Sequence, residues 1–563
     1  MVDSHRHSAA TLAVLFSLAA VPPPAPVAGQ LAMSAAAAGT APSGSRSDSA
    51  RAVHLLSRAT WGVRAGDIEA VLGAGREAWL DRQLDPAGIP DDAAASRLAA
   101  FPLSQAPPAE LYRDLSPQRA PQMQAARDSL GDDTMQAMTT GQSAARRQRN
   151  PARILTDLIG AKLQRAVYSE RQLEDVMADF WFNHFNVFFN KGQDRYLVGD
   201  YERNAIRPHV FGRFEDMLTA TAQHPAMLFY LDNWRSVYVD TLRLAQRTRG
   251  QMTAQQLAQA RSRGLNENYA RELLELHTLG VDGGYAQQDV IEVARAFTGW
   301  TFDPRAVAAG DGAFTFRPAL HDGGAKVVLG ESLPAGRGEE DGLDVIRLLS
   351  RHPATARHIA TKLVERFVAD EAPADLIEHV AAVFLATDGD LRAVTRALFT
   401  ADAFYRDEHR AAKVKTPFAL VASALRATGA EVLPSRTLAQ TLRSMGHAPF
   451  TASEPTGFPA MSADWVNTGA MLNRMNFGLD LAAGRVDGVR VDLRALAGGN
   501  AGGVGPVEGL LATVLPGVDS SVLAGRIRQD IAAQSAGQVT PRPREVAARA
   551  LGLALGSPEF QRH

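Results

Sequence analysis

Residues 154–189 read ILTDLIGAKLQRAVYSERQLEDVMADFWFNHFNVFF, the longest strongly apolar helical stretch of the chain. Apolar side chains recur in it at spacings of three and four, which is the period of an α-helix. Tyr168, Ser169 and Glu170 interrupt that period after Val167, in the pattern of a short link followed by an N-cap. The stretch therefore predicts two consecutive helices. The second has almost no solvent face, which is typical of a central position.

The helical period continues on both sides of this stretch, and a β-like period interrupts it once. Between residues 313 and 330, Phe314 and Phe316 alternate with Thr315, and an apolar run ends at Gly330, which predicts a small hairpin turning at residues 321–324. The sequence thus predicts a mainly α fold, a large multi-helix domain with a small β-hairpin insertion. Further helices are expected at residues 54–84, near 197, at 214–231, 266–279 and 284–300, in pairs over 342–425, and from 438 onward.

The first residues have the layout of a secretory signal peptide. The start MVDSHRH is polar, the apolar run 9–21 is too short for a bilayer span of about 20 residues, and prolines with small residues follow. We expect residues 1–29 to be removed on export to the periplasm or the extracellular space. No stable membrane span should remain after this cleavage.

The rest of the chain divides by composition. Residues 30–50 are dominated by Ala, Ser and Gly, which predicts a flexible tether. Residues 51–485 form the expected helical core domain. Within it, residues 104–150 are rich in Pro, Gln and Arg, which indicates an exposed, partly helical insertion. Residues 486–563 are predicted to be a Gly-rich linker followed by C-terminal helices.

Composition excludes several classes of protein. The chain has 563 residues, 46% of them hydrophobic, so it is not disordered as a whole. Its 59 Lys and Arg against 61 Asp and Glu argue against a nucleic-acid partner. The absence of cysteine excludes disulfides, thiolate zinc sites, iron–sulfur clusters and cysteine nucleophiles. HExxH, GxSxG, GxxxxGK[ST] and EF-hand motifs are also missing.

Polar residues inside apolar helices are the first candidates for chemistry. Asp179 and Asn183 share one face of the helix in DFWFNHFNVFF, residues 179–189, and His184 lies beside the aromatic residues. A buried imidazole or carboxylate must find a partner, because leaving it unpaired costs about 1 to 3 kcal/mol or more. These residues either tie helices together or form a site.

Two further segments carry candidate residues. In GLNENYARELLELHTLGVDGGY, residues 264–285, Glu272 and His277 suit an acid–base pair or a divalent metal, and suit a buried salt-bridge lattice equally well. In LHDGGAKVVLG, residues 320–330, the turn explains Asp322 and the glycines by its own geometry. That geometry does not explain His321.

Two functions follow from these candidates. In the first, the chain is an envelope enzyme with an acid–base or metal-assisted site at which these residues meet: His184, Glu272, His277, His321 and Asp322. A metal would need three or four N or O donors at about 2.0 to 2.2 Å. In the second, the chain is a non-catalytic helical module that binds a partner protein or a surface polymer. The substrate, the cofactor and the metal stay open.

The strings FWFNHFNV, HPAMLFYLDN, GLNENYARELLELHTLGVDGGY, ARAFTGW, HDGGAKVVLG, HPATARHIATKLVERFV and SEPTGFPAMSADWVN resemble the bacterial domain-of-unknown-function family 1800. They occur in the family's order and cover about residues 50–485. The resemblance implies a largely helical, exported bacterial protein, often encoded beside a second exported protein that is a candidate partner. It implies no catalytic residue. Phe458 stands where the family usually carries a tryptophan, which weakens any role for a tryptophan there.

Overall fold

The computed structural model describes residues 43–115, 150–240, 246, 248, 251–498, 505–535 and 542–563. The predicted signal peptide, most of the predicted tether and residues 116–149 of the predicted insertion lie outside these residues. The chain divides into Met1–Ser45 and Arg46–His563, and the description below concerns the second unit. In the described residues, no helix combines the length and the apolar character that crossing a membrane requires.

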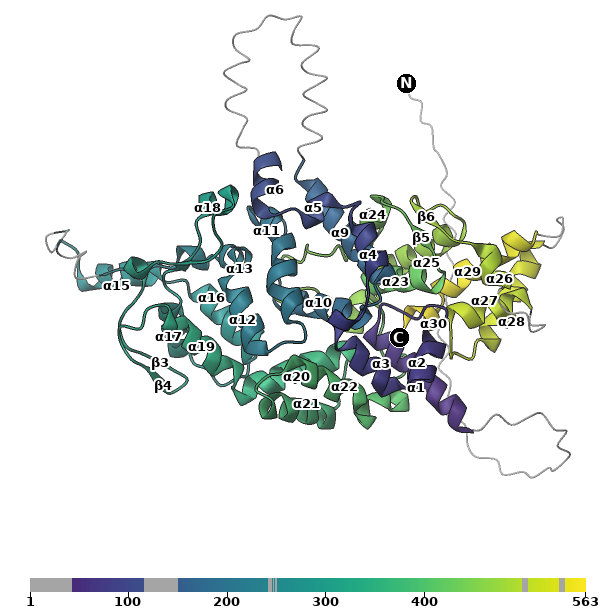
Figure 1. The fold of residues 1–563 in the computed structure, drawn as a ribbon, viewed down its shortest axis with the longest axis horizontal. Coiled ribbons are helices and arrows are strands. Elements are labelled where there is room, and N and C mark those ends of the chain that lie inside the picture. The colour runs from purple at the N-terminus through teal and green to yellow at the C-terminus, as the bar shows by residue number, and fades with distance from the viewer. Residues whose placement is uncertain are drawn as a thin grey trace, which may run out of the picture. The chain divides into compact units, whose positions relative to one another are not determined.

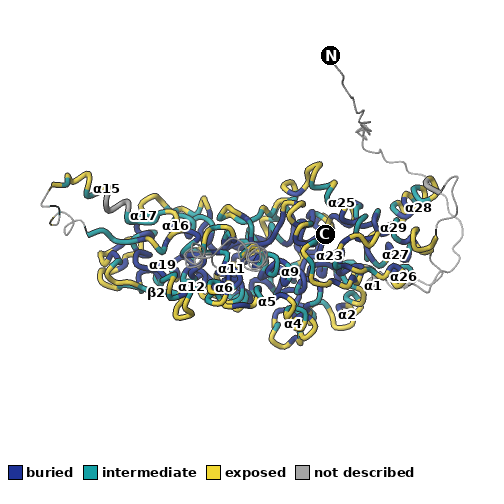
Figure 2. The backbone as a smooth tube through the Cα atoms, turned by 90° about the horizontal axis from the view of Figure 1, so that it is seen from above, coloured by how far each residue is buried: buried dark blue, intermediate teal, exposed yellow. Residues whose placement is uncertain are grey.

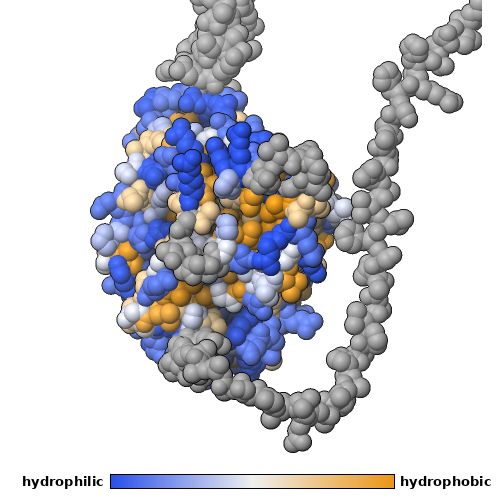
Figure 3. Space-filling view, turned by 90° about the vertical axis from the view of Figure 1, so that its right-hand side faces the viewer, coloured by the Kyte–Doolittle hydropathy of each residue, from blue (hydrophilic) through white to orange (hydrophobic). Residues whose placement is uncertain are grey.

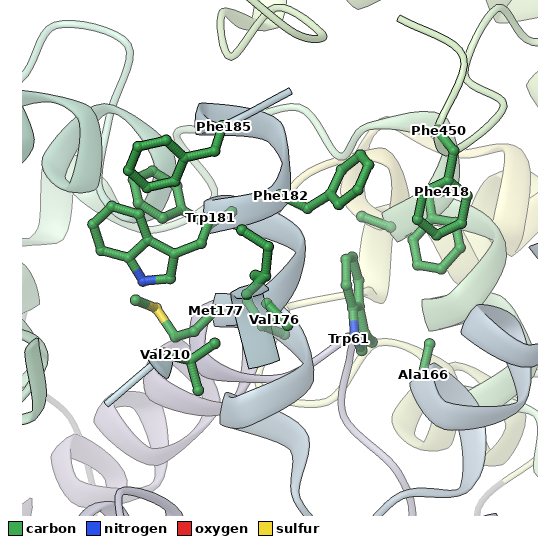
Figure 4. Packing of buried hydrophobic residues seen from close by; sticks show 14 of the residues in the cluster. Trp61, Ala166, Val176, Met177, Trp181, Phe182, Phe185, Val210, Phe418 and Phe450 are labelled. Atoms are coloured by element: carbon green, nitrogen blue, oxygen red, sulfur yellow. The ribbon is translucent and has the colours of Figure 1, made fainter. Parts of the chain in front are cut away.

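The two central helices predicted from residues 154–189 are confirmed. Helix α9 spans Ala152–Tyr168 and helix α10 spans Gln172–His184. The side chain of Gln172 holds the link between them, because its amide donates to the carbonyl oxygens of Ala166 and Ser169. No residue of α10 is exposed. In Figure 4, Phe182 points toward Phe418 and Phe450, whereas Trp181 and Phe185 point to the opposite side of the helix.

The mainly α fold is also confirmed, and Figure 1 shows its helices around α10. Helices α1 to α6 come first in the chain: α1 (Ser43–Ala59), α2 (Asp67–Ala74), α3 (Arg76–Gln83), α4 (Asp92–Leu98), α5 (Pro102–Gln105) and α6 (Pro108–Leu115). The helices between α10 and the strands are α11 (Asp194–Tyr201), α12 (Phe214–Gln223), α13 (Pro225–Tyr230), α15 (Ala254–Gly264), α16 (Glu267–Glu272), the π-helix Leu273–Thr278 and α17 (Gln287–Ala296).

The second half of the chain continues in the same way. Its helices are α18 (Pro304–Ala309), α19 (Glu340–Ser350), α20 (Pro353–Phe367), α21 (Ala374–Ala386), α22 (Leu391–Thr400), α23 (Pro417–Ala427), α24 (Thr437–Ser444), α25 (Thr468–Ala482), α26 (Leu493–Gly498), α27 (Pro506–Val514), α28 (Ser521–Ser535), α29 (Pro543–Gly556) and α30 (Pro558–Gln561). Figure 2 shows their buried residues lining the interior, with the exposed residues at the periphery.

Two helices begin at a His-Pro pair. His224 and His352 each accept the backbone N–H two residues further on through Nδ1, at 3.1 Å. Proline at the first helical position has no N–H to satisfy, so the histidine completes the cap. The pair at His224 also divides the helix predicted at residues 214–231 into α12 and α13.

The predicted hairpin forms with different pairing. Strand β3 (Lys326–Val328) pairs with β4 (Glu331–Leu333), and β2 (Thr315–Phe316) pairs instead with β1 (Trp300–Thr301); a third pair joins β5 (Glu431–Val432) and β6 (Val489–Arg490). The tight turn lies at Leu329 and Gly330, both with positive φ, and the turn predicted at residues 321–324 is therefore wrong. Asp289 fixes the turn by accepting the Leu329 N–H at 2.7 Å.

Three domain expectations differ from the structure. Residues 43–50, assigned to the tether, already belong to α1, where Asp48 lies 3.7 Å from Arg76. Residues 108–115 of the expected exposed insertion form α6, whose apolar face is buried. The C-terminal helices are not separate from the core, because α29 packs along α25. Figure 3, which views the side of the C-terminal helices, shows apolar surface among charged residues, and the exposed side chains of this region include Leu472 and Val522.

A buried ionic network holds α10 against α9. Asp175 on α10 accepts from Arg207 at 2.6 Å and from the indole N–H of Trp61 at 2.9 Å, and it lies 3.4 Å from Arg165. Glu202 completes the network, 3.1 Å from Arg165 and 3.0 Å from Arg207. Burial alone would raise the pKa of Glu202, but the two arginines hold that pKa well below its ordinary value.

We expect Asp175→Asn to lower the free energy of unfolding by at least about 3 kcal/mol, because it leaves buried arginines with one carboxylate instead of two. Urea unfolding followed by circular dichroism measures the change. The matched control is Asp388→Asn, which breaks an exposed 3.9 Å pair with Arg213 and should cost less than about 0.5 kcal/mol. Equal losses in the two variants would contradict this role for Asp175.

Candidate functional site

Two polar stripes, one on α10 and one on α20, contribute charged residues to a polar cavity that His184 also lines. Asp175, Asp179 and Asn183 are spaced by four on α10 and therefore share one face of that helix. The stripe on α20 has the same spacing: His358, Lys362 and Arg366. The stripes meet where Arg366 lies 3.7 Å from Asp179.

The cavity between these helices, called the α10–α20 cavity below, has a volume of about 360 Å³. This is far more than the roughly 10 to 15 Å³ that one water molecule needs by the same kind of measure. Its charged and imidazole side chains are Lys162, Asp179, His184, Lys362, Arg366, Lys413, His447 and His563.

Asp179 is the one acidic side chain among the residues that line this cavity. Lys162, buried on α9, lies 2.9 Å from it, and Arg366 adds a second cation. Burial would raise the pKa of Asp179, but these two cations outweigh burial and lower it. Asp179 is therefore ionised at neutral pH and is already neutralised by the protein.

The cavity carries two more cations. Lys413 is buried and bonds to the carboxylate of Asp370 and to the carbonyl oxygen of Ala460, the latter at 2.8 Å. Lys362 is half-buried and has no hydrogen-bond or ion-pair partner among the described residues. The wall thus bears four cations and one carboxylate, and one of the cations is free to bind a ligand.

A loop far along the chain closes one side of the cavity. The Asn183 side chain donates to the Phe458 carbonyl at 2.9 Å and accepts the Phe458 N–H at 2.7 Å, as a backbone segment would. Asn186 donates to the carbonyls of Ala452 and Glu454. A Cβ on Gly457, whose φ is +72°, would stand 2.4 Å from the Asn183 carbonyl oxygen. Only glycine therefore allows the loop to approach α10 this closely.

Three histidines gather beside the π-helix. His184 Nε2 donates to the carbonyl oxygen of His277 at 3.1 Å, and His358 Nε2 donates to that of Leu276 at 3.2 Å. The ring of His184 lies 6.2 Å from that of His277 and 6.1 Å from that of His358, between centroids. The two histidines that donate therefore satisfy carbonyl groups of the π-helix, whose hydrogen bonds are irregular.

Burial keeps these rings neutral. It is the main cause that lowers the pKa of His277 to about 3, and it lowers that of His184 well below its ordinary value, with the nearby His358 and His277 acting in the same direction. Because Nε2–H of His184 is a donor, Nδ1 of the neutral ring is an acceptor. His184 can thus accept a hydrogen bond through Nδ1.

The structure brings only part of the predicted site together. His184 lines the cavity, whereas His277 and Glu272 are not among the lining residues. His277 is linked to the cavity wall through its carbonyl oxygen, which accepts from His184. Burial first, and then the adjacent Glu275, raises the pKa of half-buried Glu272. Glu272 therefore has no place in this cavity, and its predicted role stays a prediction.

His321 and Asp322 form a separate, structural cluster near β3, away from α10 in Figure 1. His321 uses both ring nitrogens, one to the Thr298 carbonyl at 2.8 Å and one to Asp341 at 3.1 Å. Asp322 binds Arg295 at 2.8 Å, and this pair outweighs burial to lower the pKa of Asp322 to about 2. These hydrogen bonds anchor the hairpin, and neither residue lines the α10–α20 cavity with His184.

Lys326 completes that anchor. Its ammonium group donates to Asp341 at 2.5 Å and to the carbonyl oxygens of Asp322 and Gly324. This buried cage explains why a lysine follows the glycine-rich turn. Within the described part of the chain, no three His, Cys, Asp or Glu side chains are placed to hold a metal ion.

The cations of the cavity were missed by sequence reasoning. Lys162, Lys362, Arg366 and Lys413 belong to helices or loops with no catalytic motif. A spacing of four does link His358, Lys362 and Arg366, and that polar stripe on a helix with a buried apolar face was a detectable signal. Nothing in the spacing of Lys162 or Lys413 relates them to α20, since only the packing brings them there.

Comparison with known proteins assigns a family and no activity. The model of a family described as "Protein of unknown function (DUF1800)" matches residues 54–562. No curated protein and no solved structure matches the chain.

The cavity histidines make the protein sensitive to acid. Burial lowers the pKa of His447 to about 4, so between pH 6.5 and 4 the unfolded state binds more protons than the folded state and stability falls with pH. We expect the unfolding free energy of the wild type to decrease more steeply than that of His447→Gln as the pH is lowered through this window. The difference between the two slopes should be up to about 1.4 kcal/mol per pH unit. Urea unfolding at pH 7, 6 and 5 measures the two slopes.

The control for that experiment is His379→Gln, which changes an exposed ring on α21. It should keep the wild-type slope. Identical slopes for His447→Gln and the wild type would show that the His447 ring can be protonated inside the fold.

Proposed function

The chain belongs to the family of unknown function DUF1800, and we propose that it binds a small anion in the α10–α20 cavity. The observation that carries this proposal is the charge of the wall, where four cations face one carboxylate that is already paired. An uncompensated cation in a partly desolvated cavity is stabilised by an anionic ligand, because attraction is stronger there than in bulk water.

The geometry indicates which groups would contact the anion. Lys362 has no partner in the described ranges, so its ammonium group can turn to the ligand without breaking an ion pair seen there. Asn183 and Lys413 are held by the loop and by Asp370, and they fix the shape of the wall. The chemistry of this set suits a carboxylate, a phosphate or a sulfate group.

The cellular setting of this site is part of the proposal. The leader-like residues 1–29 support export to the periplasm or beyond the cell. A second exported protein encoded nearby is the proposed partner, on the resemblance alone. Amino-terminal sequencing of the protein purified from the cell envelope would test the export: a start near residue 30 supports it, and an intact Met1 contradicts it.

Acid–base catalysis on the bound anion is a second candidate, and the observation that favours it is the imidazole of His184 at the cavity wall. It rests on His184 alone, since the other predicted catalytic residues lie elsewhere. Incubation of the full chain with an envelope small-molecule extract, followed by mass spectrometry, tests it. Turnover that His184→Gln abolishes while anion binding persists would support the enzyme, and no turnover by the wild type would favour simple binding.

Inorganic phosphate is the first probe for the binding proposal. We expect saturable binding to the full chain at pH 7 and low salt, with a Kd at or below about 1 mM in isothermal titration calorimetry. Lys362→Met should weaken it at least tenfold, equivalent to about 1.4 kcal/mol. This variant leaves no carboxylate unpaired, so the fold should stay intact.

Lys191→Met is the matched control, since Lys191 pairs with Asp232 on the surface at 2.8 Å and does not line the cavity. It should bind phosphate like the wild type. Absence of binding by both phosphate and acetate, or equal weakening in the two variants, would overturn the proposal.

A further inference from the structure

A second cavity lies between α1 and α23 and is called the α1–α23 cavity below. Its volume is about 190 Å³, and its walls come from α1, α23, the end of α27 and α30. Arg366 and His563 line both cavities and so stand between them. None of the residues used for the proposed anion site other than Arg366 and His563 lines this second space.

Arg58 is a buried cation without a carboxylate partner on this wall. The residue is 2% exposed, and its Nη2 donates to the carbonyl oxygens of Val368 and His409 at 3.1 and 3.0 Å. Its Nε and Nη1 are buried and have no hydrogen-bond partner among the described residues. A guanidinium has five donors, so an arginine left in this state can bind a further acceptor.

Lys415 is the second buried cation. It is 8% exposed, and its Nζ lies 3.9 Å from the centre of the Phe560 ring, with no hydrogen-bond acceptor among the described residues. Burial first, and then the charge of Arg474, lowers the pKa of Lys415 to about 7. Arg474 itself is fully buried and binds the neutral side chain of Gln561.

Acidic residues do not balance these charges. Among the lining residues, the acidic side chain is Glu559, which is exposed, whereas the cations are Arg58, Arg366, Arg410, Lys415 and Arg562. Burial and the charges of Arg58, Lys415 and Arg366 together lower the pKa of His563, so these three cations lie around one ring. Two buried cations with free donors beside a cavity are a binding site for an anion, since an unpaired buried charge is costly.

Most of the remaining wall is apolar. It is formed by side chains such as Val53, Val176, Ala419, Leu515 and Phe560. An engineered apolar cavity of about 150 Å³ in another protein holds benzene, so a space of about 190 Å³ accommodates a ring or a chain of comparable size. A wall of this kind favours a ligand with a hydrocarbon part over a bare phosphate or sulfate ion.

We propose that the α1–α23 cavity is a second ligand site, which binds a small organic carboxylate with its carboxylate on Arg58 and Lys415 and its hydrocarbon part against the apolar wall. The site is independent of the anion proposed for the α10–α20 cavity. The two sites select different ligands. Binding in the α1–α23 cavity depends on burial of the ligand's hydrocarbon part as well as on charge.

Benzoate is the probe, and benzyl alcohol is its uncharged analogue of similar size. In isothermal titration calorimetry of the full chain at pH 7, we expect benzoate to bind at least tenfold more tightly than benzyl alcohol and than inorganic phosphate at this site. Benzoate binding no tighter than that of benzyl alcohol would overturn the proposal.

Two lysine variants place the site. Lys415→Met keeps the length and apolar character of the side chain and removes the charge, so benzoate affinity should fall at least tenfold while the melting temperature without ligand stays the same or rises. A merely structural role of Lys415 would lower the melting temperature of the variant. A role in binding lowers the benzoate affinity without lowering the melting temperature. A lower melting temperature with unchanged benzoate affinity would overturn the proposal.

Lys362→Met is the matched control in the other cavity. It should leave benzoate binding unchanged, and Lys415→Met should leave phosphate binding unchanged. Loss of benzoate binding in Lys362→Met but not in Lys415→Met would assign benzoate to the α10–α20 cavity and overturn the second site. If Lys362→Met lost phosphate binding and kept benzoate binding, the two ligands would occupy different sites, as proposed.

Discussion

The structure depends on the burial of α10. A helix without a solvent face must satisfy every polar group it carries inside the protein, because an unpaired buried group costs about 1 to 3 kcal/mol. Three polar residues of α10 do so with different parts of the chain, whereas the buried indole N–H of Trp181 has no hydrogen-bond partner among the described residues. Asp175 binds Arg207 and Trp61, Asp179 binds Lys162, and Asn183 binds the backbone of Phe458. One helix thereby fixes the positions of α9, the residues after α11 and the late loop.

The same requirement creates the α10–α20 cavity. The apolar faces of α10 and α20 are packed in the core, and their polar stripes lie where close packing ends. Charge at this place is unequal, because Asp179 is the only carboxylate among the lining residues and has already been neutralised by Lys162 and Arg366. The cavity is a candidate ligand site because its wall carries this excess positive charge.

The clusters around His321 and His184 show that similar residues can have different roles. Both combine imidazole, lysine and carboxylate groups from separate segments. At His321 every group is paired over short distances, and Lys326 is fully enclosed. Beside His184, Lys362 lines a cavity and has no partner within the part of the chain that the structure describes. Free donors next to open space, rather than the types of residue present, distinguish a candidate site from a structural anchor.

The sequence by itself determined the helical class, the division of α9 from α10 and the central position of α10. These features depend on neighbours within about four residues, and the periodicity records them. It also led to His184. Only the tertiary structure decided that Glu272, His321 and Asp322 lie outside the cavity, that the hairpin turns at Leu329, and that Lys162, Arg366, Lys413 and Lys415 line cavities. Those contacts join residues tens to hundreds of positions apart, and no local period encodes which faces of two helices will meet.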